Sequence, residues 1–193
     1  MDAAQWTFMH SQIMSLSVSA AVVRSRPLPV YCSEASEELR RGVQLAIRAK
    51  LAGFEPQYIE TQSDEAHVQN ITDLATSISQ GHAATLVNGV LRIGTAQKAL
   101  NLYLKYLWCL GRIKEPPHCP IDAIVLGHAH EVANVRWTQM NDIEEYKRCI
   151  NSLRLQAQER KLSLSCWELQ LWNEAQPAVQ ADAAAPRRLT ESV

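Results

Sequence analysis

One segment of this chain, residues 92–126, combines a strongly apolar helical stretch with a single thin polar stripe. The stripe consists of Lys98, Asn101 and Lys105, and at 100° per residue their side chains point within about 60° of one another. A helix that is apolar around the rest of its surface must be buried on nearly every side. Because buried lysines without partners are unfavourable, the sequence predicts that the stripe faces a cleft, a carboxylate or a polar ligand.

Elsewhere the apolar residues recur at three- and four-residue spacing, which predicts amphipathic helices. One helix is expected from after Ser33 to Gly53, and another from the N-cap Ser63 to near Gly81. Further helices are expected over 121–133, after a capping box of Asn141 with Glu144, and after a second one of Ser165 with Glu168. Strand-like alternation is weak, so the predicted fold is all-α, a single globular domain of about six helices around a buried central helix.

Three segments are expected along the chain. Residues 1–31 are rich in Ser and Ala and end in a proline-containing stretch, so they are predicted to be a poorly ordered lead-in. Residues 32–173 form the helical domain. Residues 174–193 are low in large apolar side chains and are predicted to be a disordered tail.

Charge and cysteine content restrict the function class. The formal net charge is −1, which argues against a strongly basic nucleic-acid binder. The chain nevertheless lacks acidic residues between Asp73 and Glu115, an interval that contains several cations and can present positive potential to an anion. No apolar run approaches the roughly 18 residues of a membrane span, so no membrane association is expected. Five widely spaced cysteines without a CxxC pair indicate reduced thiols and a cytoplasmic location.

A metal site is not predicted. Histidine and cysteine are zinc ligands, and His118, Cys119, His128 and His130 lie close together in sequence. Their spacing fits no standard zinc motif, and on a helix His128 and His130 would point about 160° apart. We therefore expect neither a metal nor another cofactor.

Lys98 and Asp122 are the pair best suited to chemistry. They lie 24 residues apart, at the expected openings of two helices joined by a proline-stiffened connection, so both can reach the mouth of one groove. The helix dipole favours an ionised Asp122. Burial and the nearby Lys105 disfavour a charged Lys98 amine, whereas a neighbouring carboxylate favours it, so the sequence leaves the protonation state of Lys98 open.

Residues 90–130 resemble the helix-hairpin-helix DNA glycosylases. The resemblance rests on Ile93, Gly94 and Thr95 before the helix, on Lys98 and Ala99 within it, and on a "proline, aliphatic, aspartate" segment at Pro120, Ile121 and Asp122. The archaeal 8-oxoguanine DNA glycosylases are the most similar type, because they too continue a long apolar helix from the lysine.

This resemblance implies a DNA-repair activity on a damaged base flipped out of the stack. Lys98 would be the nucleophile of a glycosylase/lyase, and Asp122 would stabilise positive charge on the sugar and help to move the proton. The candidate substrate-binding residues are Asn101 and Lys105 on the polar stripe, Trp108, Trp137 and Tyr103 for stacking on the base, and Arg92, Arg112 and Lys114 for phosphates.

Two other function classes stay open. One is a non-catalytic helical interaction protein, such as a component of a bacterial stress or genome-defence system, in which residues 95–130 are only core. In that case Lys98 and Lys105 are structural, and the aromatic residues are packing residues. The other is a small enzyme that binds a nucleotide or an anionic metabolite at the polar stripe. The distance between the Lys98 amine and Asp122, and the exposure of that amine, separate these classes.

Overall fold

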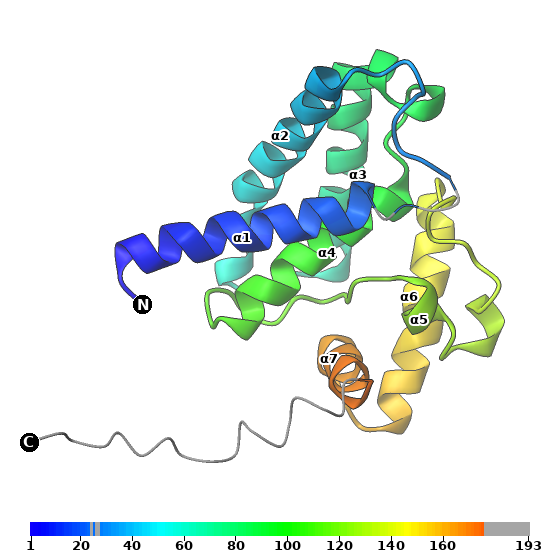
Figure 1. Cartoon of the computed structure of the whole chain (residues 1–193). Coiled ribbons are helices and arrows are strands. Elements are labelled where there is room, and N and C mark those ends of the chain that lie inside the picture. Colours follow the sequence, from blue (N-terminus) through cyan, green and yellow to red (C-terminus); the bar gives the residue numbers. More distant parts are fainter. Residues whose placement is uncertain (24, 26–27, 176–193) are drawn as a thin grey trace, which may run out of the picture.

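A computed structural model describes residues 1–23, 25 and 28–175 of the chain. These residues form seven α-helices joined by short 3₁₀ turns, and their only β-type pairing is an isolated bridge between Tyr31 and Leu86. The fold is therefore all-α, as the hydrophobic periodicity predicts (Figure 1). The helices are α1 (Ala3–Val22), α2 (Glu37–Phe54), α3 (Asp64–His82), α4 (Ile93–Cys109), α5 (Ala123–Leu126), α6 (Ile143–Glu159) and α7 (Leu164–Glu174).

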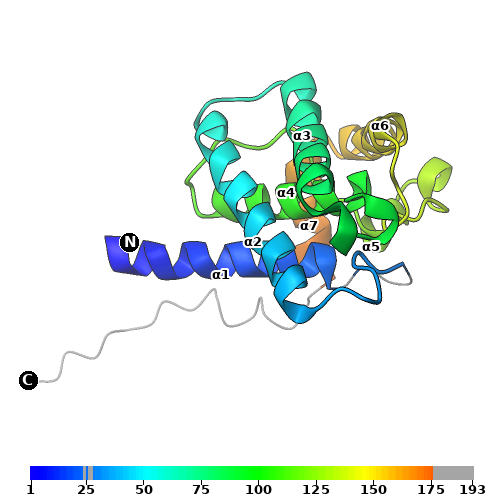
Figure 2. The same cartoon turned by 90° about the horizontal axis from the view of Figure 1, so that it is seen from above.

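Helix α4 is the centre of the molecule, as expected. Helix α1 lies across it, α3 packs beside it, and α6 contacts it further along (Figures 1 and 2). Helices α2 and α7 lie on opposite sides of α4 in Figure 1. The side chains of Leu100, Tyr103, Leu104 and Leu107 are fully buried, which accounts for the apolar character of most of the helix surface.

The N-terminal segment differs from its prediction. Residues 1–31 were expected to be poorly ordered, yet Ala3–Val22 is a 20-residue helix that starts with a capping box between Asp2 and Gln5. Its inner face enters the core through residues such as Val18 and Ala21. Serine side chains within the helix donate to carbonyl oxygens four residues earlier, as Ser17 does to Ile13. These bonds let a serine-rich segment remain helical once it has a core to pack against.

Several helix boundaries also differ. Helix α2 starts after Ser36 rather than Ser33, and the helix expected over 121–133 is reduced to the four-residue α5 and a separate 3₁₀ turn. Asp142, not Asn141, caps α6. The expected capping box of Ser165 with Glu168 is wrong, because Ser163 caps α7 and Glu168 contacts another helix. The expected disordered tail lies almost entirely outside the described residues.

A close backbone contact fixes the start of α4. The Gly94 N–H donates to the carbonyl oxygen of Met140 at 2.9 Å, and a Cβ added at Gly94 would lie 1.7 Å from the Trp137 carbonyl oxygen. Only glycine permits this approach. The segment before α6 is therefore pressed directly against the first turn of α4, one turn ahead of Lys98.

Candidate functional site

The Lys98 amine and the Asp122 carboxylate lie together, as the sequence predicts. Lys98 Nζ donates to Asp122 Oδ2 at 2.8 Å. Gln97, the residue before Lys98, holds the partner segment in place: its side chain donates to the Ile121 carbonyl oxygen and accepts from the Ile121 N–H. This two-way clasp aligns the chain at 121–122 with α4, so the ion pair has a fixed geometry.

Asp122 also caps α5. Its Oδ1 accepts hydrogen bonds from the backbone N–H groups of Ile124 and Val125, which leaves Oδ2 for the amine. Burial alone would raise the pKa of the Asp122 carboxyl, but the charge and hydrogen bond of Lys98 and the two N–H donors together hold that pKa below its ordinary value. Asp122 is therefore an anion at neutral pH.

The exposure of the two partners differs. The Lys98 side chain is 11% exposed and the Asp122 side chain 31% exposed. Beyond Asp122, Ala123 is exposed and Ile124 is 71% exposed. The ion pair thus lies at the edge of the surface beside α5, with the carboxylate on the outer side and the amine on the inner side.

Two turns further along α4, Lys105 meets a second carboxylate. Its Nζ lies 2.6 Å from Glu168 Oε2 on α7, and both side chains are nearly buried. Burial raises the pKa of the Glu168 carboxyl above its ordinary value, and the charge of Lys105 only partly offsets that rise. The Lys105 ammonium also lies 5.7 Å from the centre of the Trp172 ring, within cation–π range.

Asn101, between the two lysines, is fully buried in a hydrogen-bond network. Its Oδ1 lies 2.7 Å from His67 Nε2, and its Nδ2 donates to the Cys119 carbonyl oxygen and toward Tyr146 Oη. Burial lowers the pKa of His67 to about 3, so the ring is neutral and donates to Asn101. The polar stripe is therefore satisfied within the protein by two carboxylates and this network, which leaves it few groups for an anionic metabolite.

The network continues toward the surface through His118. Its Nδ1 lies 2.8 Å from Tyr146 Oη, and its Nε2 lies 3.5 Å from Asp64 Oδ1. Asp64 in turn pairs with Arg154 at 2.8 Å. Burial lowers the pKa of His118, and its ring contacts that of His67 edge to face at 4.6 Å between centroids. A hollow of about 250 Å³ opens beside Asp64 and His118.

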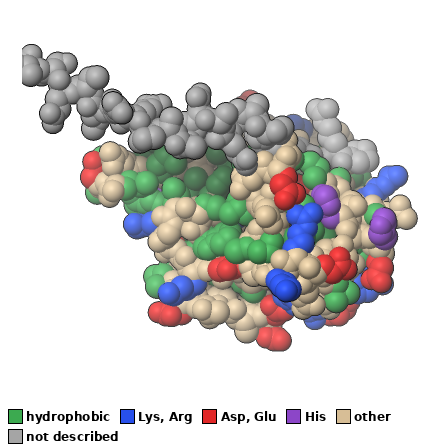
Figure 3. All heavy atoms as spheres, turned by 90° about the horizontal axis from the view of Figure 1, so that it is seen from below, with side chains coloured by type: hydrophobic (Ala, Val, Ile, Leu, Met, Phe, Trp, Pro, Cys, Tyr) green, Lys and Arg blue, Asp and Glu red, His purple; other side chains and the backbone are tan. Residues whose placement is uncertain are grey.

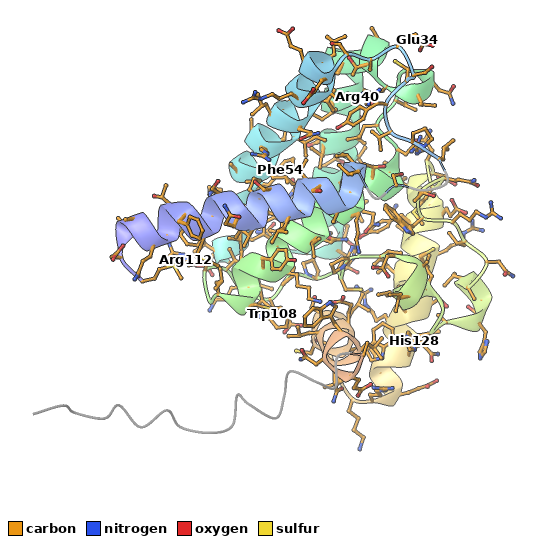
Figure 4. The ribbon with its side chains drawn as sticks, in the orientation of Figure 1. Glu34, Arg40, Phe54, Trp108, Arg112 and His128 are labelled. Carbon is orange, nitrogen blue, oxygen red and sulfur yellow. The ribbon has the colours of Figure 1, made fainter. Side chains whose placement is uncertain are left out.

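The expected phosphate contacts do not gather around Lys98. The Arg92 guanidinium is buried and donates to the carbonyl oxygens of Leu28 and Pro29. Arg112 and Lys114 are exposed beyond the C-terminal end of α4, where Figure 4 shows Arg112. The Arg112 guanidinium lies over the ring of Trp6. Of the three cations, only Arg112 and Lys114 are open to solvent, and about three turns of α4 separate Lys98 from the end of the helix that they follow.

The aromatic candidates are largely packing residues. Trp137 is buried, and its backbone carbonyl presses on Gly94. Tyr103 is fully buried and donates to Glu55 Oε2 at 2.6 Å. Trp108 is partly buried against the core. Of five hollows of about 250 to 590 Å³ on the described residues, none is lined by Lys98 or Asp122.

Comparison with protein-family profiles, with curated proteins and with solved structures finds no match. Among the described residues there is no cluster of three or more histidine, cysteine, aspartate or glutamate side chains that could hold a metal ion. None of the described helices is both long enough and apolar enough to cross a membrane.

Proposed function

We propose that this chain acts on DNA through the Lys98 amine, as a glycosylase/lyase of the kind that its resemblance to the helix-hairpin-helix glycosylases implies. The observation that supports this is the 2.8 Å contact between Lys98 Nζ on α4 and Oδ2 of Asp122, the N-cap residue of α5. An amine nucleophile needs a nearby group that accepts its proton, and a carboxylate at hydrogen-bond distance meets that need.

The proposed reaction assigns one role to each member of the pair. Asp122 takes a proton from the Lys98 ammonium, and the neutral amine attacks C1′ of a flipped, damaged purine nucleotide. The new Nζ–C1′ bond forms as the C1′–base bond breaks, and the base leaves with the electron pair and takes up a proton. Opening of the sugar ring gives a protonated Schiff base on Lys98, and loss of the C2′ proton then expels the 3′ phosphate.

Borohydride trapping tests this proposal, because reduction of the Schiff base links the protein covalently to DNA. The probes are duplexes with one abasic site or one 8-oxoguanine. Lys98→Arg keeps a cation opposite Asp122 but lacks the primary amine, so we expect at least a hundredfold loss of adduct with the fold unchanged. Lys147→Gln removes an exposed lysine and is the matched control that keeps the adduct. Adduct formation by Lys98→Arg, or its absence in the unaltered protein, contradicts the proposal.

A second candidate is the non-catalytic interaction protein. It is favoured by the burial of Lys98 inside an ion pair and by the exposure of large apolar side chains, including Trp172 at 53%. Hydrophobic side chains gather across the centre of the face drawn in Figure 3. Under this alternative no adduct forms, and an amine-acylating reagent modifies Lys147 while Lys98 remains unmodified.

A further inference from the structure

Helix α2 carries three arginines that have no carboxylate partner. Arg41 is exposed and Arg40 and Arg48 are partly exposed. Ion pairs elsewhere in the described residues engage other cations, and none of them includes Arg40, Arg41 or Arg48. Their positive charge is therefore available to a partner.

Two of these arginines share one side of α2. Arg41 and Arg48 are seven residues apart, so they point within about 20° of each other, about 10 Å apart along the axis and roughly 110° away from the buried face formed by Val43, Ile47 and Leu51. Arg40 points toward that buried face and is only partly exposed. The cations thus form a row along the helix rather than a single centre. Figure 4 shows Arg40 on α2, well apart from Trp108 and Arg112.

Two adjoining hollows accompany the row. The first, of about 450 Å³, is lined by all three arginines together with Gln44 and Leu45, and Glu37 is its one acidic side chain. The second, of about 560 Å³, shares Arg40 and Gln44 with the first and adds Tyr31. Arg40 also lies 5.7 Å from the centre of the Tyr31 ring. A ligand that follows the helix can contact both hollows.

Hydrogen-bond donors without acceptors concentrate at the same place. Six buried side-chain polar atoms in the described part of the chain have no hydrogen-bond partner, and three of them are Tyr31 Oη, Arg40 Nε and Arg48 Nε. Burial raises the pKa of Tyr31, and the Gln44 side chain and the charge of Arg40 partly oppose that rise. Arginine Nε can only donate. Because these three atoms are buried, a bound anion meets the outer N–H groups of the arginines instead, and an acceptor with several oxygens, such as a phosphate group, suits those groups.

We propose that this arginine surface, formed by Arg40, Arg41 and Arg48 with Tyr31 and Gln44, binds the phosphate backbone of a nucleic acid. Guanidinium groups match phosphate oxygens through paired N–H donors, and a row of them suits successive phosphates. The choice of nucleic acid rather than a lipid headgroup rests on the proposed function, and α2 exposes no aromatic side chain that would anchor it in a membrane interface.

Fluorescence anisotropy of the full chain with a labelled 20-base-pair duplex, over a series of salt concentrations, tests the proposal. Replacing Arg41 and Arg48 together by Gln should weaken binding at least tenfold at physiological salt and reduce the slope of log K against log salt by about 2. Arg136 and Arg148 are exposed and lie outside α2, so their double Gln variant is the matched control with an unchanged slope. The double Lys variant at 41 and 48 should keep most of the slope, since it keeps the charge.

Separate outcomes identify a failure of each proposal. Equal DNA binding by the Arg41 and Arg48 double variant and by the control overturns the arginine surface. So does arginine-dependent binding to vesicles with 30% phosphatidylserine, or to inorganic phosphate, when the duplex is not bound. Lys98→Arg should bind the duplex normally, and the arginine variant should still form the borohydride adduct at saturating DNA. If the unaltered protein binds the duplex but forms no adduct, only the proposed Lys98 chemistry is contradicted.

Discussion

Two lysines on the same stripe of α4 form ion pairs of nearly equal length, yet their carboxylate partners differ in protonation behaviour. Lys98 pairs with Asp122 at 2.8 Å, and the pKa of that carboxyl is lowered. Lys105 pairs with Glu168 at 2.6 Å, and the pKa of that carboxyl is raised. The length of the ion pair therefore does not decide the sign of the shift.

The surroundings of each carboxylate explain the difference. Asp122 is 31% exposed and accepts two backbone N–H bonds at the opening of α5. Glu168 is 8% exposed and has Lys105 as its only hydrogen-bond donor among the described contacts. A single lysine does not offset the loss of water around a buried carboxylate, whereas a lysine, two N–H groups and partial solvation do. The comparison teaches that backbone N–H donors and partial solvation, rather than the length of the ion pair, set the sign of the shift in carboxyl pKa.

The largest effect is expected from disturbing the backbone that fixes the Lys98 end of α4. Gly94→Ala places a methyl group against the Trp137 carbonyl, so we expect a loss of more than about 4 kcal/mol in the free energy of unfolding, measured by urea denaturation. Gly81→Ala is the control, since an added Cβ there meets no atom within 4 Å, and it should be neutral or slightly stabilising. Equal stability of the two variants would show that the 137–140 segment does not hold α4.

Breaking the Lys105 pair should have the next largest effect. Lys105→Met leaves the buried Glu168 carboxyl without its donor, so we expect a loss of about 3 kcal/mol in urea denaturation. Adding Glu168→Leu removes the uncompensated group, and the double variant should return to within about 1 kcal/mol of the unaltered protein. A double variant as unstable as the single one would contradict the view that burial outweighs the attraction in this pair.

A smaller loss is expected at Asp122. Asp122→Ala removes both the cap of α5 and the partner of Lys98, which together contribute about 2 kcal/mol. Asp122→Asn keeps an oxygen for the cap and should cost about half as much. Thermal unfolding of the two variants side by side separates capping from charge. Identical losses in the two variants would mean that the cap contributes nothing measurable, and a loss in Asp122→Ala alone would mean that the ion pair contributes nothing measurable.

The pH dependence should distinguish the two pairs by sign. A lowered pKa means that the Asp122 carboxylate stabilises the fold above its unfolded value of 3.8, and that this contribution is lost as pH falls through the folded pKa. A raised pKa means that Glu168 reduces stability as pH rises above its unfolded value of 4.5. We therefore expect two trends in urea denaturation as pH rises from 3 to 7. The free energy of unfolding of the unaltered protein should increase relative to that of Asp122→Asn. It should decrease relative to that of Glu168→Gln. If stability depends on pH in the same way in all three proteins, the opposite signs of the two pKa shifts are contradicted.

The sequence predicts the all-α fold, the central helix and the approach of Lys98 to Asp122 because each depends on local periodicity and on a stiff connection. The helix at Ala3–Val22 could not be predicted in this way. Its serines break the apolar pattern, and its helical state depends on contact with α4, which is distant in sequence.

Residues that act across large sequence separations were missed. Glu168 was interpreted as part of a capping box, but it lies 63 residues from Lys105 and meets it only in the folded chain. Gln97 carries no signal of its own, although its clasp on Ile121 is what aligns Asp122. The three arginines of α2 are present in the sequence within one expected helix. They went unrecognised because an arginine face is normally neutralised by neighbouring glutamates, and only the folded structure shows that Glu37 and Glu38 form no such pairs.

The burial of His67 and His118, whose rings meet edge to face, makes the stability of the protein sensitive to acid. Burial lowers the pKa of His67 to about 3 and also lowers the pKa of His118, so each imidazole takes up a proton more readily in the unfolded chain, below about pH 6.5. Each such unmatched proton removes up to about 1.4 kcal/mol of stability per pH unit. Mild acid therefore destabilises the fold through these two buried imidazoles at pH values above those at which ordinary carboxylates take up protons.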